Sequence, residues 1–232
     1  MAGILYGVGV GPGDPELMTL KAVRLIKEND VIAVPGTDPK ESTAYKIAAG
    51  AVPEIADKTL VAVDIPMLKD LEKVIAAHKA GAEQVAAYLE KGQNVVFLNL
   101  GDITVYSSYM YIQNHVKEMG YEAEVVSGIT SFCAAAARLD IPLCEWSEPL
   151  HIIPALHRTK EALNLPGNYV LMKSGKSMKE VKELLRASGK DVMMVENCGM
   201  PDEKIYRSVD EIPDDAGYFS LIIAKDRHDP LG

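Results

Sequence analysis

The chain has 232 residues, 48% of them hydrophobic, which is enough for one large domain or two smaller domains with cores of their own. Its 24 Lys and Arg residues against 33 Asp and Glu give a formal charge of −9, which argues against a broad attraction to nucleic acid or anionic lipid. Three widely spaced cysteines, Cys133, Cys144 and Cys198, exclude a disulfide scaffold and favour reduced thiols in a cytoplasmic protein.

The N-terminal sequence MAGILYGVGVGPGD lacks the basic region of a signal peptide, and glycines soon interrupt its apolar run. We find no apolar stretch near the roughly 20 residues that a membrane span needs. We therefore expect neither a signal peptide nor a membrane association.

Short, mostly apolar runs alternate with helical segments in the first half, the pattern of an α/β sheet with crossover helices. Strands that such helices bury on both faces are apolar along their whole length. The expected strands are Ile4–Val10, Asp30–Val34, Thr59–Asp64 and Asn94–Leu100, and the expected helices are Leu17–Glu28, Thr43–Ala51, Leu68–Lys91 and Ser107–Met119. In the third helix we expect a buried stripe of Leu71, Val74, Ile75, Val85, Ala86 and Leu89.

Gly120 follows the fourth helix, and we place the domain boundary there. Residues 1–119 then form an N-terminal α/β domain with a mostly parallel sheet and a glycine-rich loop, and residues 120–232 form a C-terminal α/β domain with a mixed sheet. The second domain is expected to hold the strands Glu122–Val126, Leu150–Pro154, Tyr169–Lys173, Val192–Glu196 and Tyr218–Ala224, and helices over 131–139 and 177–188.

Residues 7–15, GVGVGPGDP, join the first strand to a helix. Glycines at alternate positions let a ligand approach the backbone and permit turns with positive φ. The dinucleotide pattern G-x-G-x-x-G fails, because its last position is Pro12 when counted from Gly7 and Asp14 when counted from Gly9. An NAD site is therefore disfavoured, and a glycine-rich turn without a ligand is the structural alternative.

The segment Ser174-Gly175-Lys176-Ser177 has the ending of a phosphate-binding loop. The position of the leading glycine is occupied by Val170, inside a predicted strand. We therefore favour a glycine turn in which Ser177 caps the following helix and Glu180 stands at its third position.

Two more glycine turns follow predicted strands. Gly101 and Asp102 come directly after the fourth strand, where ligands of open α/β sheets bind. The Asp102 carboxylate could accept hydrogen bonds from a ribose or an amino group, or it could cap the next helix. Residues 127–131 repeat the order of glycine turn, small hydroxyl residues and helix, and there Thr130 or Ser131 could be the cap.

Together these segments resemble the tetrapyrrole (class III) methyltransferases of cobalamin and sirohaem synthesis. The motifs are Gly-x-Gly-x-Gly-Pro-Gly-Asp-Pro-Glu-Leu-x-Thr, Gly-Asp-x-x-x-Tyr-Ser and Ser-Gly-Ile-Thr-Ser. The sequences GDITVYSSYMYI and YFSLIIAK are most similar to the precorrin-2 C20-methyltransferases. The resemblance covers the whole chain. It implies two α/β domains, the tetrapyrrole methylase fold, with a cleft between them for S-adenosylmethionine, which becomes S-adenosylhomocysteine.

The resemblance also implies the site residues. It places Tyr106 near the methyl donor, where the tyrosine or a carboxylate such as Asp102 could assist loss of the C20 proton. Because the protein carries net negative charge, the carboxylates of the tetrapyrrole need local cations. The implied substrate contacts are Asp14, Lys21, Arg24 and Arg158, and the implied cofactor contacts are Gly11, Pro12, Leu100, Gly101, Asp102, Val105, Thr130, Ser131, Met172 and Gly199.

The activity that the resemblance implies is methylation of C20 of precorrin-2 or cobalt-precorrin-2, in cobalamin biosynthesis. The expected protein is a cytoplasmic homodimer without a metal site, since the five histidines are scattered. Two alternatives stay open: methylation at another ring position, C11 or C17, and a ligand-binding or regulatory α/β protein without turnover. The sequence does not indicate whether the substrate carries cobalt.

Overall fold

The computed structural model describes residues 1–66, 70–155 and 159–227. The chain divides into two compact units, Met1–Thr130 (unit 1) and Ser131–Gly232 (unit 2). The boundary therefore lies later than the predicted one at 119/120. The reason is that β5 (Glu122–Val126), which we assigned to the second domain, pairs in parallel with β1 (Ile4–Gly9) in the first sheet.

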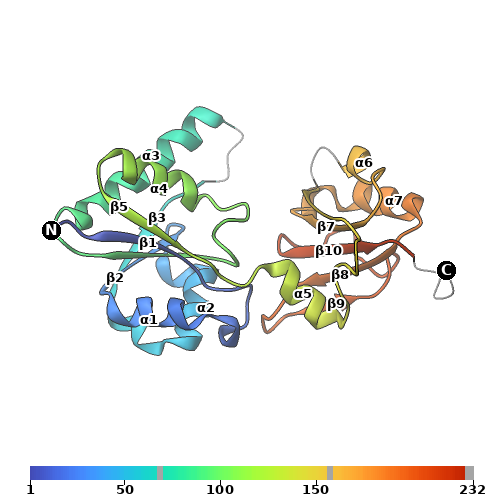
Figure 1. The fold of residues 1–232 in the computed structure, drawn as a ribbon, viewed down its shortest axis with the longest axis horizontal. Helices are drawn as coiled ribbons and strands as arrows, with labels where there is room; N and C mark the ends of the chain where they lie inside the picture. Colours follow the sequence, from blue (N-terminus) through green and yellow to red (C-terminus); the bar gives the residue numbers. More distant parts are fainter. Residues whose placement is uncertain (67–69, 156–158, 228–232) are drawn as a thin grey trace. The chain divides into compact units, whose positions relative to one another are not determined.

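Unit 1 contains a five-stranded sheet in the order β3-β2-β4-β1-β5, and all of its strand pairs are parallel (Figure 1). The carboxyl ends of the strands consequently meet at one edge of the sheet, where open α/β sheets bind their ligands. The remaining elements of this unit are β2 (Val31–Pro35), β3 (Thr59–Val63), β4 (Val95–Asn99), α1 (Leu20–Glu28), α2 (Thr43–Ala51), α3 (Leu71–Leu89) and α4 (Tyr109–Glu118).

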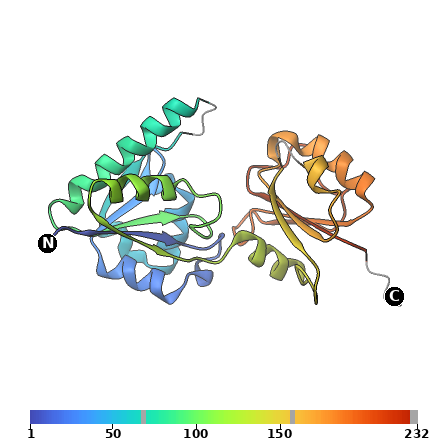
Figure 2. The same cartoon turned by 45° about the horizontal axis from the view of Figure 1, so that its top comes forward.

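Helices α1 and α2 cover one face of the sheet of unit 1, and α3 and α4 cover the other (Figures 1 and 2). Successive side chains of a strand point to opposite faces. In β4, Val96 packs in one core cluster with residues of α1 and α2, whereas Phe97 packs in the other with residues of α3 and α4. This double burial explains why the strand sequences are apolar at nearly every position.

The buried stripe predicted for α3 is partly wrong. Leu71 is 69% exposed and Ile75 is 50% exposed, whereas Val85 and Leu89 are buried as expected. The first turns of α3 extend past the sheet, so their apolar side chains have no strand beneath them (Figure 2). Burial along this helix begins at His78.

Unit 2 contains a mixed five-stranded sheet in the order β6-β7-β10-β8-β9. Among the described strands of this sheet, β6 and β7 are parallel neighbours and the other pairs are antiparallel, including those of β10 with β7 and with β8. Helix α7 packs on one face through Val181 and Leu185, and α5 contacts β8 and β10 on the opposite face (Figure 2). The elements are α5 (Ser131–Leu139), β6 (Leu150–Pro154), α6 (Thr159–Ala162), β7 (Asn168–Met172), α7 (Met178–Ser188), β8 (Asp191–Glu196), β9 (Lys204–Tyr206) and β10 (Ser220–Lys225).

Both units are thus α/β, which confirms the predicted fold class. Helix α6 and strand β9 were not predicted, because segments of four and three residues are too short to show a periodic pattern.

Candidate functional site

The loops that follow β1, β4 and β5 meet backbone to backbone at the carboxyl edge of the first sheet. The amide of Gly11 donates to the carbonyl of Gly101 at 3.2 Å, and the amide of Gly101 donates back to Gly11 at 2.7 Å. A Cβ atom on Gly128 would lie 2.2 Å from the Gly101 oxygen and 2.9 Å from Cα of Gly9. We call these four residues, Gly9, Gly11, Gly101 and Gly128, the glycine junction.

The alternating glycines after β1 therefore have different roles. A Cβ on Gly7 would lie 2.2 Å from the Tyr109 ring, and one on Gly9 would lie 2.6 Å from the Gly101 oxygen. Packing inside unit 1 thus explains two glycines that the sequence analysis attributed to the approach of a ligand. Gly11 instead needs its left-handed backbone, with φ +80°, to enter the junction.

Asp102 joins the loop after β4 to the loop after β5. Its Oδ1 accepts hydrogen bonds from the Thr104 amide at 2.8 Å and from the Thr104 hydroxyl, and its Oδ2 accepts one from the Gly128 amide at 2.9 Å. Burial works to raise the pKa of this carboxyl, but these hydrogen bonds outweigh it and hold the pKa below the usual value. An engaged carboxylate with a lowered pKa is a weak base, which argues against Asp102 as the proton acceptor.

Asn99 fixes the rest of the loop after β4. Its Nδ2 donates to the Leu100 carbonyl at 2.8 Å, and its Oδ1 accepts a hydrogen bond from the Ser107 hydroxyl at 2.7 Å. Tyr106, within this loop, is 45% exposed and has a left-handed backbone with φ 52°. Such strained non-glycine residues cluster at functional sites. Asn99 was predicted only as part of the strand Asn94–Leu100, although a side-chain amide near the end of a strand was a usable signal.

Two buried hydroxyl oxygens at strand ends have no hydrogen-bond partner among the described residues: Oγ1 of Thr130, after β5, and Oγ of Ser174, after β7. A buried hydroxyl without a partner costs free energy, so each marks a point where a ligand atom could bond. Thr130 was predicted as a cofactor contact, whereas Ser174 was predicted only as part of a turn. Its missing partner could not be known from the sequence.

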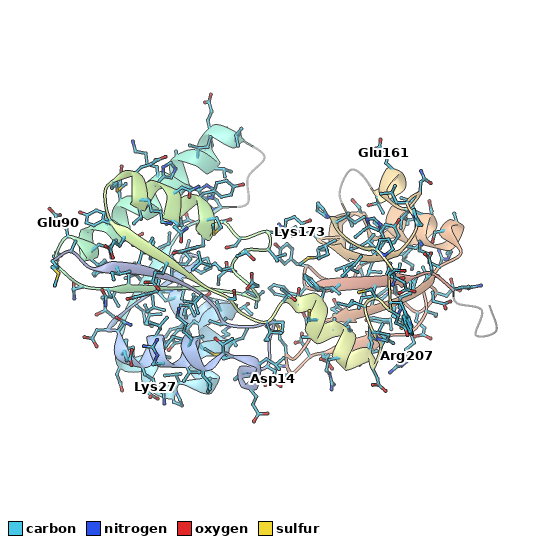
Figure 3. The ribbon with its side chains drawn as sticks, viewed as in Figure 1. Asp14, Lys27, Glu90, Glu161, Lys173 and Arg207 are labelled. Carbon is cyan, nitrogen blue, oxygen red and sulfur yellow. The ribbon has the colours of Figure 1, made fainter. Side chains whose placement is uncertain are left out.

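Strained backbone also marks the carboxyl ends of β7 and β8 in unit 2. Lys173 directly follows β7, beside Met172, and has φ 60° (Figure 3). Asn197 directly follows β8 with φ 53°, and Gly199 follows with φ 74°. Both predicted contacts in this unit, Met172 and Gly199, therefore lie at strand ends next to unusual backbone conformations.

The predicted substrate residue Asp14 caps the short 3-10 helix Pro15–Leu17 after β1, where its Oδ1 accepts a hydrogen bond from the Glu16 amide at 2.9 Å (Figure 3). This capping role is the one that its position at a helix start favours. Arg158, another predicted substrate residue, lies outside the described residues.

The other two predicted substrate cations, Lys21 and Arg24, line a pocket of about 370 Å³ together with Tyr6 and Glu124. Tyr6 and Glu124 are partners in the register of β1 and β5, so this pocket lies beside the middle of those strands. Arg24 also pairs with Glu28 at 2.6 Å. The pocket therefore holds acidic side chains as well as basic ones, and it lies apart from the glycine junction.

The structure thus brings together part of the predicted site. Gly11 and Gly101 meet in the junction, Asp102 bridges it, and Pro12 and Thr130 follow in the adjoining loops. Leu100, Val105 and Tyr106 belong to the loop that Asn99 and Asp102 hold. The remaining predicted contacts, Ser131, Met172 and Gly199, belong to unit 2.

Across residues 1–66, 70–155 and 159–227, no helix combines the length and the apolar character that crossing a membrane requires. Within those same ranges, no group of three or more His, Cys, Asp or Glu side chains is arranged to hold a metal ion.

The sequence and the fold are both similar to those of known proteins. The family model described as "Tetrapyrrole (Corrin/Porphyrin) Methylases" matches residues 4–212. The chain is 34% identical to a probable cobalt-precorrin-2 C(20)-methyltransferase of Methanocaldococcus jannaschii over 95% of each chain. It is 31% identical to a precorrin-2 C(20)-methyltransferase of Sinorhizobium sp over 97% of each. Its fold is similar to that of a uroporphyrin-III C-methyltransferase from Thermus thermophilus, which was solved in complex with S-adenosylhomocysteine. The TM-score is 0.72 at 22% sequence identity, and the alignment covers 96% of this chain and 97% of the Thermus chain.

Proposed function

The chain belongs to the family of tetrapyrrole (corrin/porphyrin) methylases, and on that premise we propose that it transfers a methyl group from S-adenosylmethionine to C20 of precorrin-2 or cobalt-precorrin-2. The observation that carries this proposal is the similarity, over nearly the full length of each chain, to relatives named for that reaction. The protein is accordingly a methyltransferase of cobalamin biosynthesis.

The cofactor supplies, when bound, an electrophilic methyl group on a sulfonium. The residues that would hold it are those at the strand ends. Gly11 and Gly101 leave no side chain between a ligand and the backbone. Oγ1 of Thr130, which has no hydrogen-bond partner among the described residues, can bond a polar ligand atom. The further proposed contacts are Pro12, Leu100, Asp102, Val105, Ser131, Met172 and Gly199. The Thermus relative solved with S-adenosylhomocysteine supports a cofactor of this kind.

The main task of the protein in this reaction is to align the meso carbon of the substrate with the methyl group of the cofactor. When the bond between the methyl group and the sulfonium sulfur breaks, the neutral thioether S-adenosylhomocysteine is a good leaving group, and the methylated C20 then loses its proton. Holding the meso carbon close to the methyl group and in line with it therefore supplies most of the rate enhancement. Asp102 contributes by fixing the loop after β4, and its lowered pKa keeps it anionic. Tyr106, on that same loop, is the proposed residue nearest the reacting atoms, where its ring packs against the macrocycle.

The remaining assignments extend the proposal. Lys21, Arg24 and Arg158 are the proposed cations for the substrate carboxylates, with Asp14 at the margin of the substrate site. The working protein is proposed to be a cytoplasmic homodimer. Light scattering tests the dimer: a particle with the mass of one chain, 25.2 kDa, at micromolar concentration would refute it.

The proposed reaction is tested with labelled methyl groups. The purified protein is incubated with methyl-labelled S-adenosylmethionine and precorrin-2, with and without cobalt, and NMR then locates the label in the product. We expect the label at C20. A label at C11 or C17 would assign a different step to the protein, and binding of S-adenosylhomocysteine without turnover would favour the ligand-binding alternative.

Substituting Tyr106 by Phe separates positioning from proton transfer. If the ring only packs against the macrocycle, Tyr106→Phe keeps the rate within a few-fold and leaves the affinity for S-adenosylhomocysteine unchanged, which is the outcome that we expect. General acid–base assistance by the hydroxyl would instead make its loss cost roughly 100-fold or more. Single-turnover rates at saturating S-adenosylmethionine distinguish the two, and a drop of several hundredfold would contradict the positioning role.

A further inference from the structure

The turn after β8 is tied to helix α5 by an ion pair between Arg138 and Glu203. Nε of Arg138 donates to Oε1 of Glu203 at 2.8 Å and to Oε2 at 3.1 Å, and Nη2 donates to Oε1. Oε2 of Glu203 also accepts a hydrogen bond from the Gly199 amide at 2.8 Å. One carboxylate therefore connects the last turn of α5 with the left-handed glycine of this turn.

The Glu203 side chain is only 13% exposed, although that of Arg138 is 57% exposed. Hydrogen bonds from Arg138 hold the pKa of Glu203 below its usual value, against an opposing contribution from burial, and the Gly199 amide adds to the lowering. The segment between them closes on itself, because the Met200 amide donates to the Asn197 carbonyl and the Glu203 amide donates to the Met200 carbonyl. Residues 197–203 thus form a compact loop, and the Glu203 carboxylate attaches this loop to Arg138 of α5.

We propose that Glu203 and Arg138 are positioning residues that hold the Gly199 turn in the conformation that receives the methyl donor. The inference rests on the proposed function, which gives Gly199 its contact with the cofactor. An isolated exposed ion pair would stabilise unit 2 only slightly. A carboxylate that also binds a left-handed backbone amide determines where that amide stands, so its effect should fall on ligand affinity more than on folding.

Unit 2 also provides a matched control. Nε of Arg186 donates to Oδ1 of Asp210 at 2.9 Å, and Nη2 of Arg186 lies 2.8 Å from the same oxygen, so this is also an arginine–carboxylate ion pair. The side chains of Arg186 and Asp210 are 46% and 78% exposed, and they join α7 to the segment before β10 rather than to the Gly199 turn. Asp210→Asn therefore removes a comparable ion pair without reaching the turn.

The first experiment needs no ligand. Hydrogen exchange of the Gly199 amide is measured in the full chain, as wild type, Glu203→Gln and Asp210→Asn. We expect exchange about tenfold faster in Glu203→Gln, because the charged acceptor is lost and the amide that replaces it confronts the Arg138 donors. Asp210→Asn should match the wild type. Equal protection in Glu203→Gln and the wild type would overturn the inference.

The second experiment measures the cofactor. Calorimetry with S-adenosylhomocysteine should show affinity about tenfold weaker in Glu203→Gln, and the KM for S-adenosylmethionine should rise similarly while kcat changes less than twofold. The reversed pair Arg138→Glu/Glu203→Arg restores the ion pair but leaves no acceptor for the Gly199 amide, so it should recover thermal stability without recovering affinity.

The outcomes separate the two claims. A wild type that fails to bind S-adenosylhomocysteine refutes the proposed cofactor and with it the ligand part of this inference, whereas hydrogen exchange still decides whether Glu203 orders the turn. If the wild type binds and a folded Glu203→Gln variant binds equally well, the proposed function stands and the positioning role is refuted. Recovery of affinity by the reversed pair would show that Arg138 and Glu203 act only on stability.

Discussion

In each unit a carboxylate holds the backbone amide of a glycine in a turn after a strand, but the surroundings of the two carboxylates differ. In unit 1, the Asp102 carboxylate binds the Gly128 amide at 2.9 Å, and in unit 2 the Glu203 carboxylate binds the Gly199 amide at 2.8 Å. Asp102 is buried among neutral donors and beside glycines in backbone contact, whereas Glu203 depends on a guanidinium that is half exposed. Backbone sterics therefore set the strand-end conformation in unit 1, and side-chain electrostatics set it in unit 2.

The largest effect is expected from adding a methyl group to the glycine junction, which tests whether backbone sterics set the strand-end conformation of unit 1. Gly128→Ala would place Cβ 2.2 Å from the Gly101 oxygen, which only a backbone shift can relieve. We expect a loss of about 3 kcal/mol in the free energy of unfolding, measured by urea titration with circular dichroism.

Gly189→Ala is the control for that substitution. Gly189 has φ +69° and no atom within 4 Å of an added Cβ, so the same change costs only the left-handed backbone, about 1 to 2 kcal/mol. If Gly128→Ala is no worse than Gly189→Ala, backbone contact does not set the conformation of unit 1.

The next largest effect is expected from Asp102→Asn. The NH2 group of the new side chain must face the backbone amide of either Thr104 or Gly128. Both amides are donors, so one buried hydrogen bond is lost in either orientation. The free energy of unfolding should fall by about 2 kcal/mol. Glu203→Gln, next to a half-exposed partner, should cost less than about 1 kcal/mol. Equal losses in the two variants would contradict the comparison between the units.

The smallest effect is a dependence of these penalties on pH. Both carboxyls have pKa values below their ordinary ones, which are about 3.9 for Asp and 4.3 for Glu in unfolded chains. Their stabilisation is complete above those unfolded values and is lost as the pH falls through the folded ones. The penalty of Asp102→Asn should therefore be constant from pH 5 to 7 and shrink below about pH 4. A penalty that grows in acid would show that Asp102 does not fold as a carboxylate.

Much of the fold could be predicted because its strands are buried on both faces. Glu122–Val126 and Leu150–Pro154 were predicted with the observed limits, although Glu122–Val126 was assigned to the wrong domain. A sequence shows that a segment is a strand more clearly than it shows which sheet receives it. The exposed Leu71 and Ile75 illustrate the same limit, since helical spacing identifies an apolar face without showing how far the sheet beneath it extends.

Part of the candidate site could likewise be predicted from the sequence, and part of it could not. Gly101 and Asp102 were identified as a strand-end turn, and the structure places them there. The hydrogen bond that the Gly128 amide donates to Asp102 and the contact of Gly9 with both turns could not be predicted, because they depend on β1 lying between β4 and β5. The Arg138–Glu203 pair spans 65 residues, and the sequence has no short-range pattern that connects its members.

The central position of β1 also affects how the protein is made. This strand is synthesised before both of its neighbours in the sheet, which are β4, at Val95–Asn99, and β5, at Glu122–Val126. At a synthesis rate of roughly 5 to 20 residues per second, β1 waits several seconds without a partner. Unpaired apolar strands aggregate most readily when they contain few glycines. Gly7 and Gly9, which the finished sheet needs for close packing, are therefore also expected to lower the tendency of the unpaired strand to aggregate.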